Sequence, residues 1–240
     1  MMFDLVMFDL DGTLVATAPE TCRAVNDSLS RFGLAPVEVG QVEHWIGEGT
    51  RELLVHAVAF ACRSSVAATR TSRLLERVVQ QFALCAYPRH CGTFSTPYPH
   101  ALDVLRALRR RGVKLAMVTN KELRYTRALL QRHGMAALLD TVIGGDSLPT
   151  RKPDPAGLLA CLQQFEVPAA RALFVGDSAI DVAAARNAGV PVWAVTHGYN
   201  RGEPIARALP DRLLPDLLPL LEIATDRTAP TETTETSTWQ

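Results

Sequence analysis

The stretch Phe3-Asp4-Leu5-Val6-Met7-Phe8-Asp9-Leu10-Asp11-Gly12-Thr13-Leu14 joins a short apolar run to a pair of acidic residues. An apolar run of this length, bounded by turn signals, is typical of a buried β-strand. The run ends at Asp9 and Asp11, which are followed by Gly and Thr. Because a buried and unpaired charge is costly, the packing of a strand does not by itself explain two carboxylates at this point. A bound cation would offset the cost.

Mg²⁺ is a suitable cation, since proteins bind it through one or two carboxylates together with water and phosphate oxygens. A cation beside Asp9 would also let this carboxylate approach a phosphoryl group as a nucleophile, which gives an aspartyl-phosphate. A calcium-binding loop is a rival interpretation, but its sixth position requires Gly and this chain has Leu14 there. An acidic turn at the end of a strand stays open as a second alternative.

Length and composition narrow the class of protein. The chain has 240 residues, enough for one large domain or for a core with an insert. It has 25 basic and 25 acidic residues, so the strongly basic character typical of nucleic-acid-binding proteins is absent. No apolar stretch reaches the roughly 18 residues that span a bilayer, and the N-terminus does not resemble a secretory signal. We therefore expect no nucleic-acid or membrane partner, and a monomer or a homodimer.

The cysteines indicate the compartment. Their number is five, and no Cys-x-x-Cys pair occurs. An odd number without such a pair fits a reducing environment better than a disulfide framework. We expect a cytoplasmic protein.

Hydrophobic periodicity after the first strand is helical. Apolar residues at three-to-four spacing predict helices over residues 19–32, 39–62 and 66–87, the second of them broken near Gly47 and Gly49. We therefore expect an all-helical insert over residues 17–87.

Beyond residue 97 the pattern changes to alternating strands and helices. We predict helices over 99–111, 123–133, 155–165, 179–188 and 215–224, and strands over 113–118, 141–143, 172–175 and 190–195. Such alternation indicates a parallel sheet covered by helices on both faces. The expected fold is α/β, with a Rossmann-like parallel-sheet core formed by residues 1–16 and 88–224. Residues 225–240, rich in Thr and Glu, are predicted to be a disordered tail.

Polar residues follow the predicted strands. They are Asp9 and Asp11, Thr119-Asn120-Lys121, Lys152 in the loop after the 141–143 strand, and Asp177 with Asp181 a turn later. Because parallel strands end at the same edge, and open α/β sheets bind ligands there, these side chains should converge in one crevice. They would provide a cation site, a nucleophile, a hydroxyl donor and a fixed positive charge, which is what phosphoryl transfer requires.

Each of these residues also has a structural interpretation. Thr119, Asp177 and Ser178 are good helix N-caps, Asp181 would stabilise the first turn of a helix, and Lys152 could be a solvated loop residue. Taken together, at the ends of several strands, they favour a catalytic site.

The motifs and their order resemble those of the haloacid dehalogenase-like phosphatases. Four segments match: Asp-x-Asp-Gly-Thr from Asp9, the strand-end Thr119, Lys152-Pro153, and Gly-Asp-Ser-x-x-Asp from Gly176. The helical insert resembles the small cap domain of that family. Segments such as Trp45-Ile46-Gly47-Glu48-Gly49, Thr119-Asn120-Lys121 and Gly144-Gly145-Asp146-Ser147-Leu148-Pro149 are similar to the phosphoglycolate phosphatases. Ala16-Thr17 departs from the Asp-Ser usual in that family.

The resemblance implies a Mg²⁺-dependent phosphomonoesterase acting on a small phosphorylated metabolite. It assigns Asp9 as the nucleophile and Asp11 as the general acid and base. Mg²⁺ would be held by Asp9, by the backbone carbonyl of Asp11 and by Asp177. Asp181 would fix a metal-bound water or Lys152 from outside the ligand set.

The same resemblance gives the remaining roles and the substrate. Thr119 and nearby backbone N–H groups would hold phosphoryl oxygens, and Lys152 would offset negative charge. The expected substrate is 2-phosphoglycolate, with Asn120 as a further substrate-binding residue. Lys121 is our first choice for binding the carboxylate, because it lies two residues beyond Thr119. Arg51 and Arg201 are the other candidates, and a solvated surface cation is the structural interpretation of all three. Hydrolysis of another small sugar or metabolite phosphate, and a non-catalytic regulatory protein on the same fold, are the alternatives.

Overall fold

The computed structural model describes residues 3–223, and its centre is a six-stranded sheet. The strand order is β5 (Thr141–Ile143), β4 (Lys114–Val118), β1 (Leu5–Phe8), β6 (Ala172–Gly176), β7 (Val192–Val195) and β8 (Arg212–Leu214). All neighbouring strands are parallel. The α/β fold with a parallel sheet, predicted from the sequence, is confirmed.

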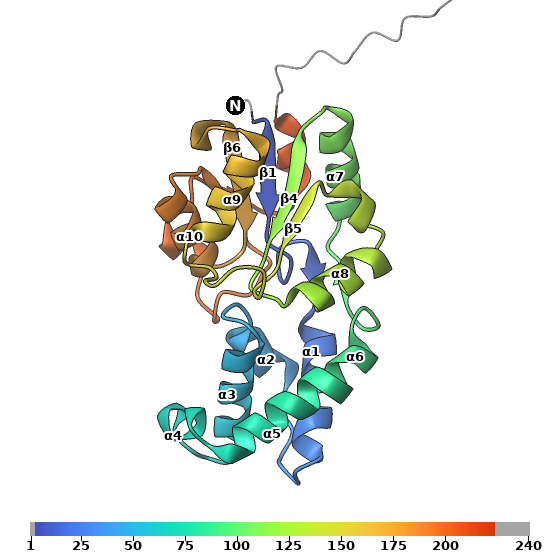
Figure 1. The fold of residues 1–240 in the computed structure, drawn as a ribbon, viewed down its shortest axis with the longest axis vertical. Helices are drawn as coiled ribbons and strands as arrows, with labels where there is room; N and C mark the ends of the chain where they lie inside the picture. Colours follow the sequence, from blue (N-terminus) through green and yellow to red (C-terminus); the bar gives the residue numbers. More distant parts are fainter. Residues whose placement is uncertain (1–2, 224–240) are drawn as a thin grey trace, which may run out of the picture.

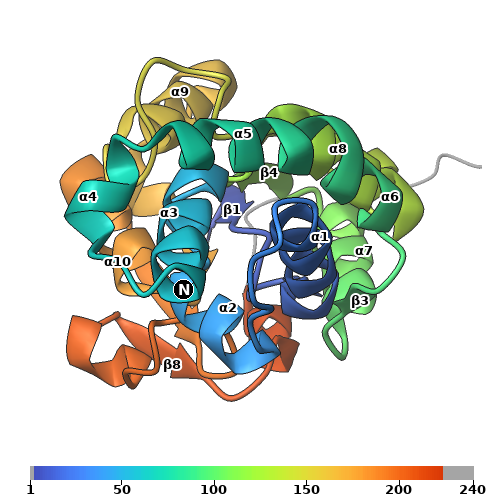
Figure 2. The ribbon, with the colours of Figure 1, turned by 90° about the horizontal axis from the view of Figure 1, so that it is seen from below.

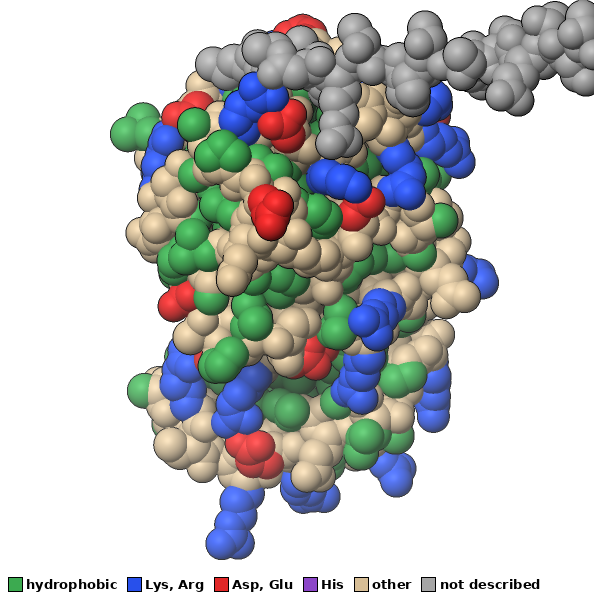
Figure 3. All heavy atoms as spheres, turned by 45° about the horizontal axis from the view of Figure 1, so that its top comes forward, with side chains coloured by type: hydrophobic (Ala, Val, Ile, Leu, Met, Phe, Trp, Pro, Cys, Tyr) green, Lys and Arg blue, Asp and Glu red, His purple; other side chains and the backbone are tan. Residues whose placement is uncertain are grey.

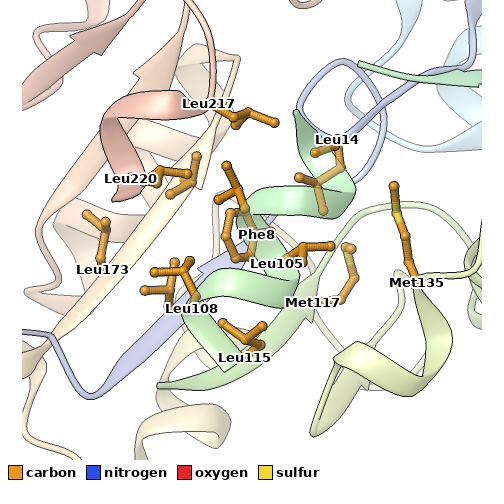
Figure 4. Close-up of a cluster of buried hydrophobic side chains, with 14 of the residues drawn as sticks. Phe8, Leu14, Leu105, Leu108, Leu115, Met117, Met135, Leu173, Leu217 and Leu220 are labelled. Carbon is orange, nitrogen blue, oxygen red and sulfur yellow. The ribbon is translucent and has the colours of Figure 1, made fainter. Parts of the chain in front are cut away.

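Helices cover both faces of this sheet, and the alternation of side chains along the strands explains the two layers. In β1, Val6 and Phe8 point to the face covered by α7 (Ala101–Arg110) and α8 (Leu123–Arg132). Leu5 and Met7 point to the opposite face, covered by α9 (Ala156–Phe165) and α10 (Ala179–Ala188). Figure 4 shows the first cluster, with Phe8 among leucines of α7 and of the C-terminal segment.

A separate helical part lies at the carboxyl edge of the sheet, towards which the strands run (Figures 1 and 2). Its helices are α1 (Ala18–Ser30), α2 (Val39–Trp45), α3 (Thr50–Ala61), α4 (Val66–Arg70), α5 (Arg73–Gln81) and α6 (Tyr87–His90). They enclose an apolar cluster of their own that includes Leu29, Leu54, Leu75 and Phe82. The helical part therefore has its own core and covers the edge where the predicted catalytic residues lie.

The chain leaves the sheet for the helical part and returns through two adjacent crossings. A short antiparallel pair joins them, formed by β2 (Val15–Ala16) and β3 (Thr96–Pro97), with Val15 opposite Pro97. This pair was not predicted from the sequence, because two-residue strands give no periodicity.

Two predicted elements differ from the structure, and one further strand was not predicted. The segment over 66–87 is not one helix: Ser72 caps a new helix by accepting a hydrogen bond from the Leu75 backbone N–H, and a π-helical turn (Phe82–Ala86) follows. The predicted last helix is a short 3₁₀ helix (Leu218–Glu222), and the edge strand β8 was not predicted. The predicted disordered tail lies outside the described residues.

Charged side chains of both signs lie on the surface. On the face shown in Figure 3, basic and acidic side chains are interspersed. Over residues 3–223, no helix has the length and apolar character needed to cross a bilayer.

Candidate active site

Three carboxylates converge at the carboxyl edge of the sheet. Asp9 follows β1, Asp177 follows β6, and Asp181 lies in the first turn of α10. One oxygen from each lies within 4.8 Å of the other two, and all three residues are buried. The convergence predicted from the ends of the strands is therefore present.

The Asp-Gly-Thr turn after β1 is shaped to receive Asp177. Gly12 has a φ of +85°, and a Cβ there would lie 2.3 Å from Asp177 Oδ2, so only glycine fits. Thr13 Oγ1 donates a 2.6 Å hydrogen bond to Asp177 Oδ1, and the Tyr199 backbone N–H donates one of 2.6 Å to Oδ2. These contacts fix the Asp177 carboxylate beside Asp9.

The Lys152 ammonium lies between two of the three carboxylates. Its Nζ is 2.9 Å from Asp9 Oδ1 and 2.7 Å from Asp181 Oδ1, and the side chain is 3% exposed. Burial opposes its charge, but Asp181 and Asp9 more than compensate, so the pKa of Lys152 lies above its usual value. The alternative of a solvated loop lysine is therefore wrong.

Asp181 also stabilises the first turn of α10, as its structural interpretation predicted, and Ser178 is the N-cap. Its Oδ2 accepts hydrogen bonds from Ser178 Oγ and from the backbone N–H groups of Ser178 and Asp177, while Oδ1 accepts from Lys152. Three donors thus share Oδ2, and Lys152 takes one of the two lone-pair positions of Oδ1. Asp177 accepts two hydrogen bonds and retains free lone pairs. Asp177 is thus better placed than Asp181 to bind a cation directly.

The charge balance of this cluster fits a divalent cation. Burial and the neighbouring charges of Asp181 and Asp11, partly offset by Lys152, raise the pKa of Asp9 to about 6. Burial and the charges of Asp181 and Asp9 raise the pKa of Asp177 well above its usual value. No donor within the described part of the chain is aligned with Asp9 Oδ1, although the Lys152 ammonium is close. A cation with oxygen ligands would add the positive charge that Lys152 alone does not supply to three carboxylates.

Asp11 lies at the border between the sheet edge and the helical part. Its Oδ1 accepts a 2.6 Å hydrogen bond from Thr17 Oγ1. Lys121 Nζ lies 3.1 Å from Oδ1 and 3.3 Å from Oδ2. Asp11 is therefore held by a residue at the start of the helical part and by a cation of the core.

Thr119 and Asn120 are both buried beside these groups. Thr119 Oγ1 accepts a hydrogen bond from the Lys121 backbone N–H at 3.3 Å, and the N-cap of α8 is Glu122, not Thr119. Asn120 Nδ2 donates to the carbonyl oxygens of Gly47, in the helical part, and of Lys152, at 2.9 and 3.0 Å. Asn120 thus ties the helical part to the loop that carries Lys152.

A cavity of about 40 Å³ lies between the sheet edge and the helical part. Its lining from the core is Asp9, Asp11, Thr119, Asn120 and Lys121, and its lining from the helical part is Thr21, Ile46, Gly47, Gly49, Thr50, Leu53, Phe82 and Tyr87. Since a cavity that holds one water needs roughly 10–15 Å³ by the same measure, only a small group fits here.

Arg51 is a predicted substrate-binding residue that the structure does not bring to this cavity. Successive helical residues point about 100° apart, so Thr50 faces the cavity while Arg51 faces α5. The Arg51 guanidinium pairs with Glu76 at 2.7 Å, and its side chain is 42% exposed. Arg51 therefore lies outside the cavity that Lys121 and Asn120 line.

Other residues of the site were missed by the sequence analysis. Thr13 and Thr17 orient Asp177 and Asp11, and Thr50 and Tyr87 line the cavity. Thr13 could have been found, because it belongs to the same strand-end turn as Asp9. The residues of the helical part gave no local signal, since their position depends on how this part packs on the sheet.

Comparisons with known proteins agree with this geometry. The family model for haloacid dehalogenase-like hydrolases matches residues 3–189. The chain is 39% identical over 221 residues to phosphoglycolate phosphatase 1 of Pseudomonas aeruginosa, covering 92% of this chain and 79% of that protein. It is 39% identical over 217 residues to a phosphoglycolate phosphatase of Pseudomonas putida, covering 90% and 78%.

A solved structure shares the fold. The crystal structure of a "predicted phosphoglycolate phosphatase" from Haemophilus somnus 129PT superposes with a TM-score of 0.87 at 34% sequence identity. The similarity covers 92% of this chain and 98% of that one. The arrangement of sheet and helical part is thus shared over nearly the whole described chain.

Proposed function

This chain belongs to the haloacid dehalogenase-like hydrolases, and from that premise we propose that it hydrolyses 2-phosphoglycolate to glycolate and phosphate through an aspartyl-phosphate on Asp9. The enzyme is a phosphoric monoester hydrolase. One observation carries the mechanistic proposal: Lys152 joins Asp9 to Asp181, and Asp177 lies within the same cluster. Relatives with the name phosphoglycolate phosphatase support the choice of substrate.

In the proposed first step, a carboxylate oxygen of Asp9 bonds to phosphorus while the bond from phosphorus to the ester oxygen breaks. Asp11 gives its proton to the departing oxygen, which leaves as the hydroxyl of glycolate. In the second step Asp11 takes a proton from water, whose oxygen bonds to phosphorus. The bond to Asp9 then breaks, which releases phosphate and restores the carboxylate.

The other residues hold charge and position. Lys152 balances negative charge beside Asp9, and Thr119 with nearby backbone N–H groups binds phosphoryl oxygens. Asp9, Asp177 and the backbone carbonyl of Asp11 would hold Mg²⁺, with Asp181 acting through Lys152. When bound, Mg²⁺ supplies positive charge at the phosphoryl oxygens. Residues 17–87, which form most of the helical part, are our proposed cap domain, which excludes water and limits the leaving group.

We further propose that the enzyme works in the cytoplasm, as a monomer or a homodimer. Its five cysteines are free thiols, which supports a reducing compartment.

Removal of divalent cations should abolish turnover of 2-phosphoglycolate, and Mg²⁺ should restore it. Lys152 is a single cation beside three buried carboxylates, so Mg²⁺ should add stabilising charge and raise the melting temperature of the wild-type protein. Activity measured with EDTA and then with excess Mg²⁺, together with thermal unfolding, checks both. Asp177→Asn should weaken the Mg²⁺-dependent rise in melting temperature. Unchanged turnover in EDTA would rule out the metal-dependent mechanism. If the enzyme hydrolyses other small phosphate esters but not 2-phosphoglycolate, the proposed substrate is wrong.

Lys121→Ala should lower kcat/KM on 2-phosphoglycolate about tenfold more than on ethyl phosphate. Both leaving groups have two carbons, but only one carries a carboxylate, and a site that pairs with a charge rejects the analogue without it. Arg51→Ala, which removes a cation from the outer face of α3, serves as the matched control. It should change kcat/KM for both substrates by less than about twofold. If Lys121→Ala lowers kcat/KM equally on both substrates, another residue binds the carboxylate.

A further inference from the structure

Lys121 belongs to the core, but an aromatic ring of the helical part faces its charge. The Lys121 ammonium lies 4.8 Å from the centre of the Tyr87 ring. The Lys121 side chain is only 8% exposed, so little water competes for this ammonium. A cation over an aromatic face is attracted to it, and the attraction grows when the pair is desolvated.

The Tyr87 ring is itself held on several sides. Its hydroxyl donates a 2.8 Å hydrogen bond to Glu20 Oε1. Phe82 stacks against the ring at 5.0 Å and Tyr125 meets it edge-on at 4.6 Å. Tyr87 is 2% exposed. The position of its ring is therefore fixed by packing and by one buried hydrogen bond.

Glu20 connects this ring to both chain crossings. It lies in the first turn of α1, where the chain enters the helical part, and it is fully buried. Its second oxygen accepts a 2.7 Å hydrogen bond from the Gly92 backbone N–H, where the chain returns after α6. Glu20 thus sets Tyr87 relative to the two segments that join the helical part to the sheet.

The contact between Tyr87 and Lys121 forms across the interface of the two parts. The same interface is closed by the hydrogen bond from Asn120 to Gly47 and by one from Thr50 Oγ1 to Glu122 Oε2 at 2.7 Å. Tyr87 and Lys121 also line the same cavity. The ring therefore meets the ammonium where a leaving group would lie.

We propose that Tyr87 is a positioning residue that holds the Lys121 ammonium at the place where the carboxylate of the substrate binds. The inference rests on the proposed function, because it makes the helical part responsible for aiming the cation that selects an anionic leaving group. Glu20 anchors the ring, and Asp11 binds one side of the same ammonium, which leaves its other N–H donors for the substrate. The alternative is that Tyr87 only fills space in the core of the helical part.

The test compares kcat/KM for 2-phosphoglycolate with kcat/KM for ethyl phosphate and uses their ratio as the selectivity. Tyr87→Leu should lower the selectivity about tenfold, because it removes the aromatic face. When Tyr87→Leu is added to the Lys121→Ala variant, the selectivity should alter by less than about twofold, because the ammonium is already absent. Tyr87→Phe keeps the ring face and should keep the selectivity. Tyr125→Leu, which loosens the same aromatic cluster but keeps the Tyr87 ring, should lower kcat/KM for both substrates alike.

A second measurement does not depend on any substrate. Brief labelling of the whole protein with acetic anhydride, followed by mass spectrometry, measures the reactivity of Lys121 against that of exposed Lys114. We expect Lys121 to be labelled about tenfold faster in Tyr87→Leu than in the wild type, and little faster in Tyr125→Leu.

Either of two kinetic results would overturn the proposal: equal losses of kcat/KM on both substrates in Tyr87→Leu, or the same loss of selectivity with and without Lys121. Unchanged labelling of Lys121 in Tyr87→Leu would do the same. A wild-type enzyme that does not hydrolyse 2-phosphoglycolate would instead reject the proposed function, and the labelling would still decide on the role of Tyr87.

Discussion

Asp9→Asn is expected to lower phosphatase turnover by roughly 10⁵-fold or more, the scale on which enzymes lose rate when the nucleophile is removed. An amide is a poor nucleophile, and it cannot balance the charge of Mg²⁺. Steady-state assays with 2-phosphoglycolate and Mg²⁺ measure the loss. Residual activity within about tenfold of wild type would exclude Asp9 as the nucleophile.

The same variant should remain folded. Lys152 keeps its 2.7 Å contact with Asp181 when Asp9 is replaced. The raised pKa of Asp9, caused chiefly by its burial, means that its ionised form costs stability at neutral pH when no metal is bound. A neutral amide removes this cost, so the metal-free melting temperature at pH 7.5 should not fall. Thermal unfolding followed by circular dichroism shows whether the variant is still folded when its activity is lost.

Asp11→Asn is expected to lower turnover of 2-phosphoglycolate by ~10²-fold to 10⁴-fold, the usual contribution of general acid and base catalysis. The metal should still bind, because only the backbone carbonyl of Asp11 is proposed as a ligand. The rise in melting temperature on adding Mg²⁺ should therefore be retained, in contrast to Asp177→Asn.

A substrate with a better leaving group sharpens this test. Acetyl phosphate releases acetate, which needs no proton from Asp11, so the first step should survive in Asp11→Asn while hydrolysis of the aspartyl-phosphate stays slow. Rapid-quench measurements should show a burst of about one acetate per active site. Near-normal turnover of 2-phosphoglycolate would refute the acid and base role of Asp11.

The sheet could be predicted because its signals are local. Apolar runs in β1, β4 and β6 alternate with amphipathic helices, and each run ends in a polar residue. The edge strand β8 was missed because it has only three residues and follows a proline, so it shows no hydrophobic periodicity. Its middle residue, Leu213, is also 43% exposed. The helix predicted over 66–87 was wrong because two caps and a π-helical turn interrupt an otherwise continuous apolar stripe.

Residues of the core part of the site could be placed for the same reason, since parallel strands bring their carboxyl ends together. Asp9, Lys152, Asp177 and Asp181 lie in one cluster although they are far apart in sequence. The contribution of the helical part could not be derived in this way. Tyr87 and Thr50 reach the cavity through the packing of helices, and one helical step separates Thr50 from the outward-facing Arg51.

Trapping the phosphorylated enzyme tests the central claim most directly. Wild-type enzyme mixed with Mg²⁺ and 2-phosphoglycolate, and quenched in acid within the first turnovers, should carry one phosphoryl group that peptide mass spectrometry locates on Asp9. Asp11→Asn should accumulate more of this species with acetyl phosphate. A phosphoryl group found on Ser178 or Thr119, or rapid turnover with none on Asp9, would contradict the account.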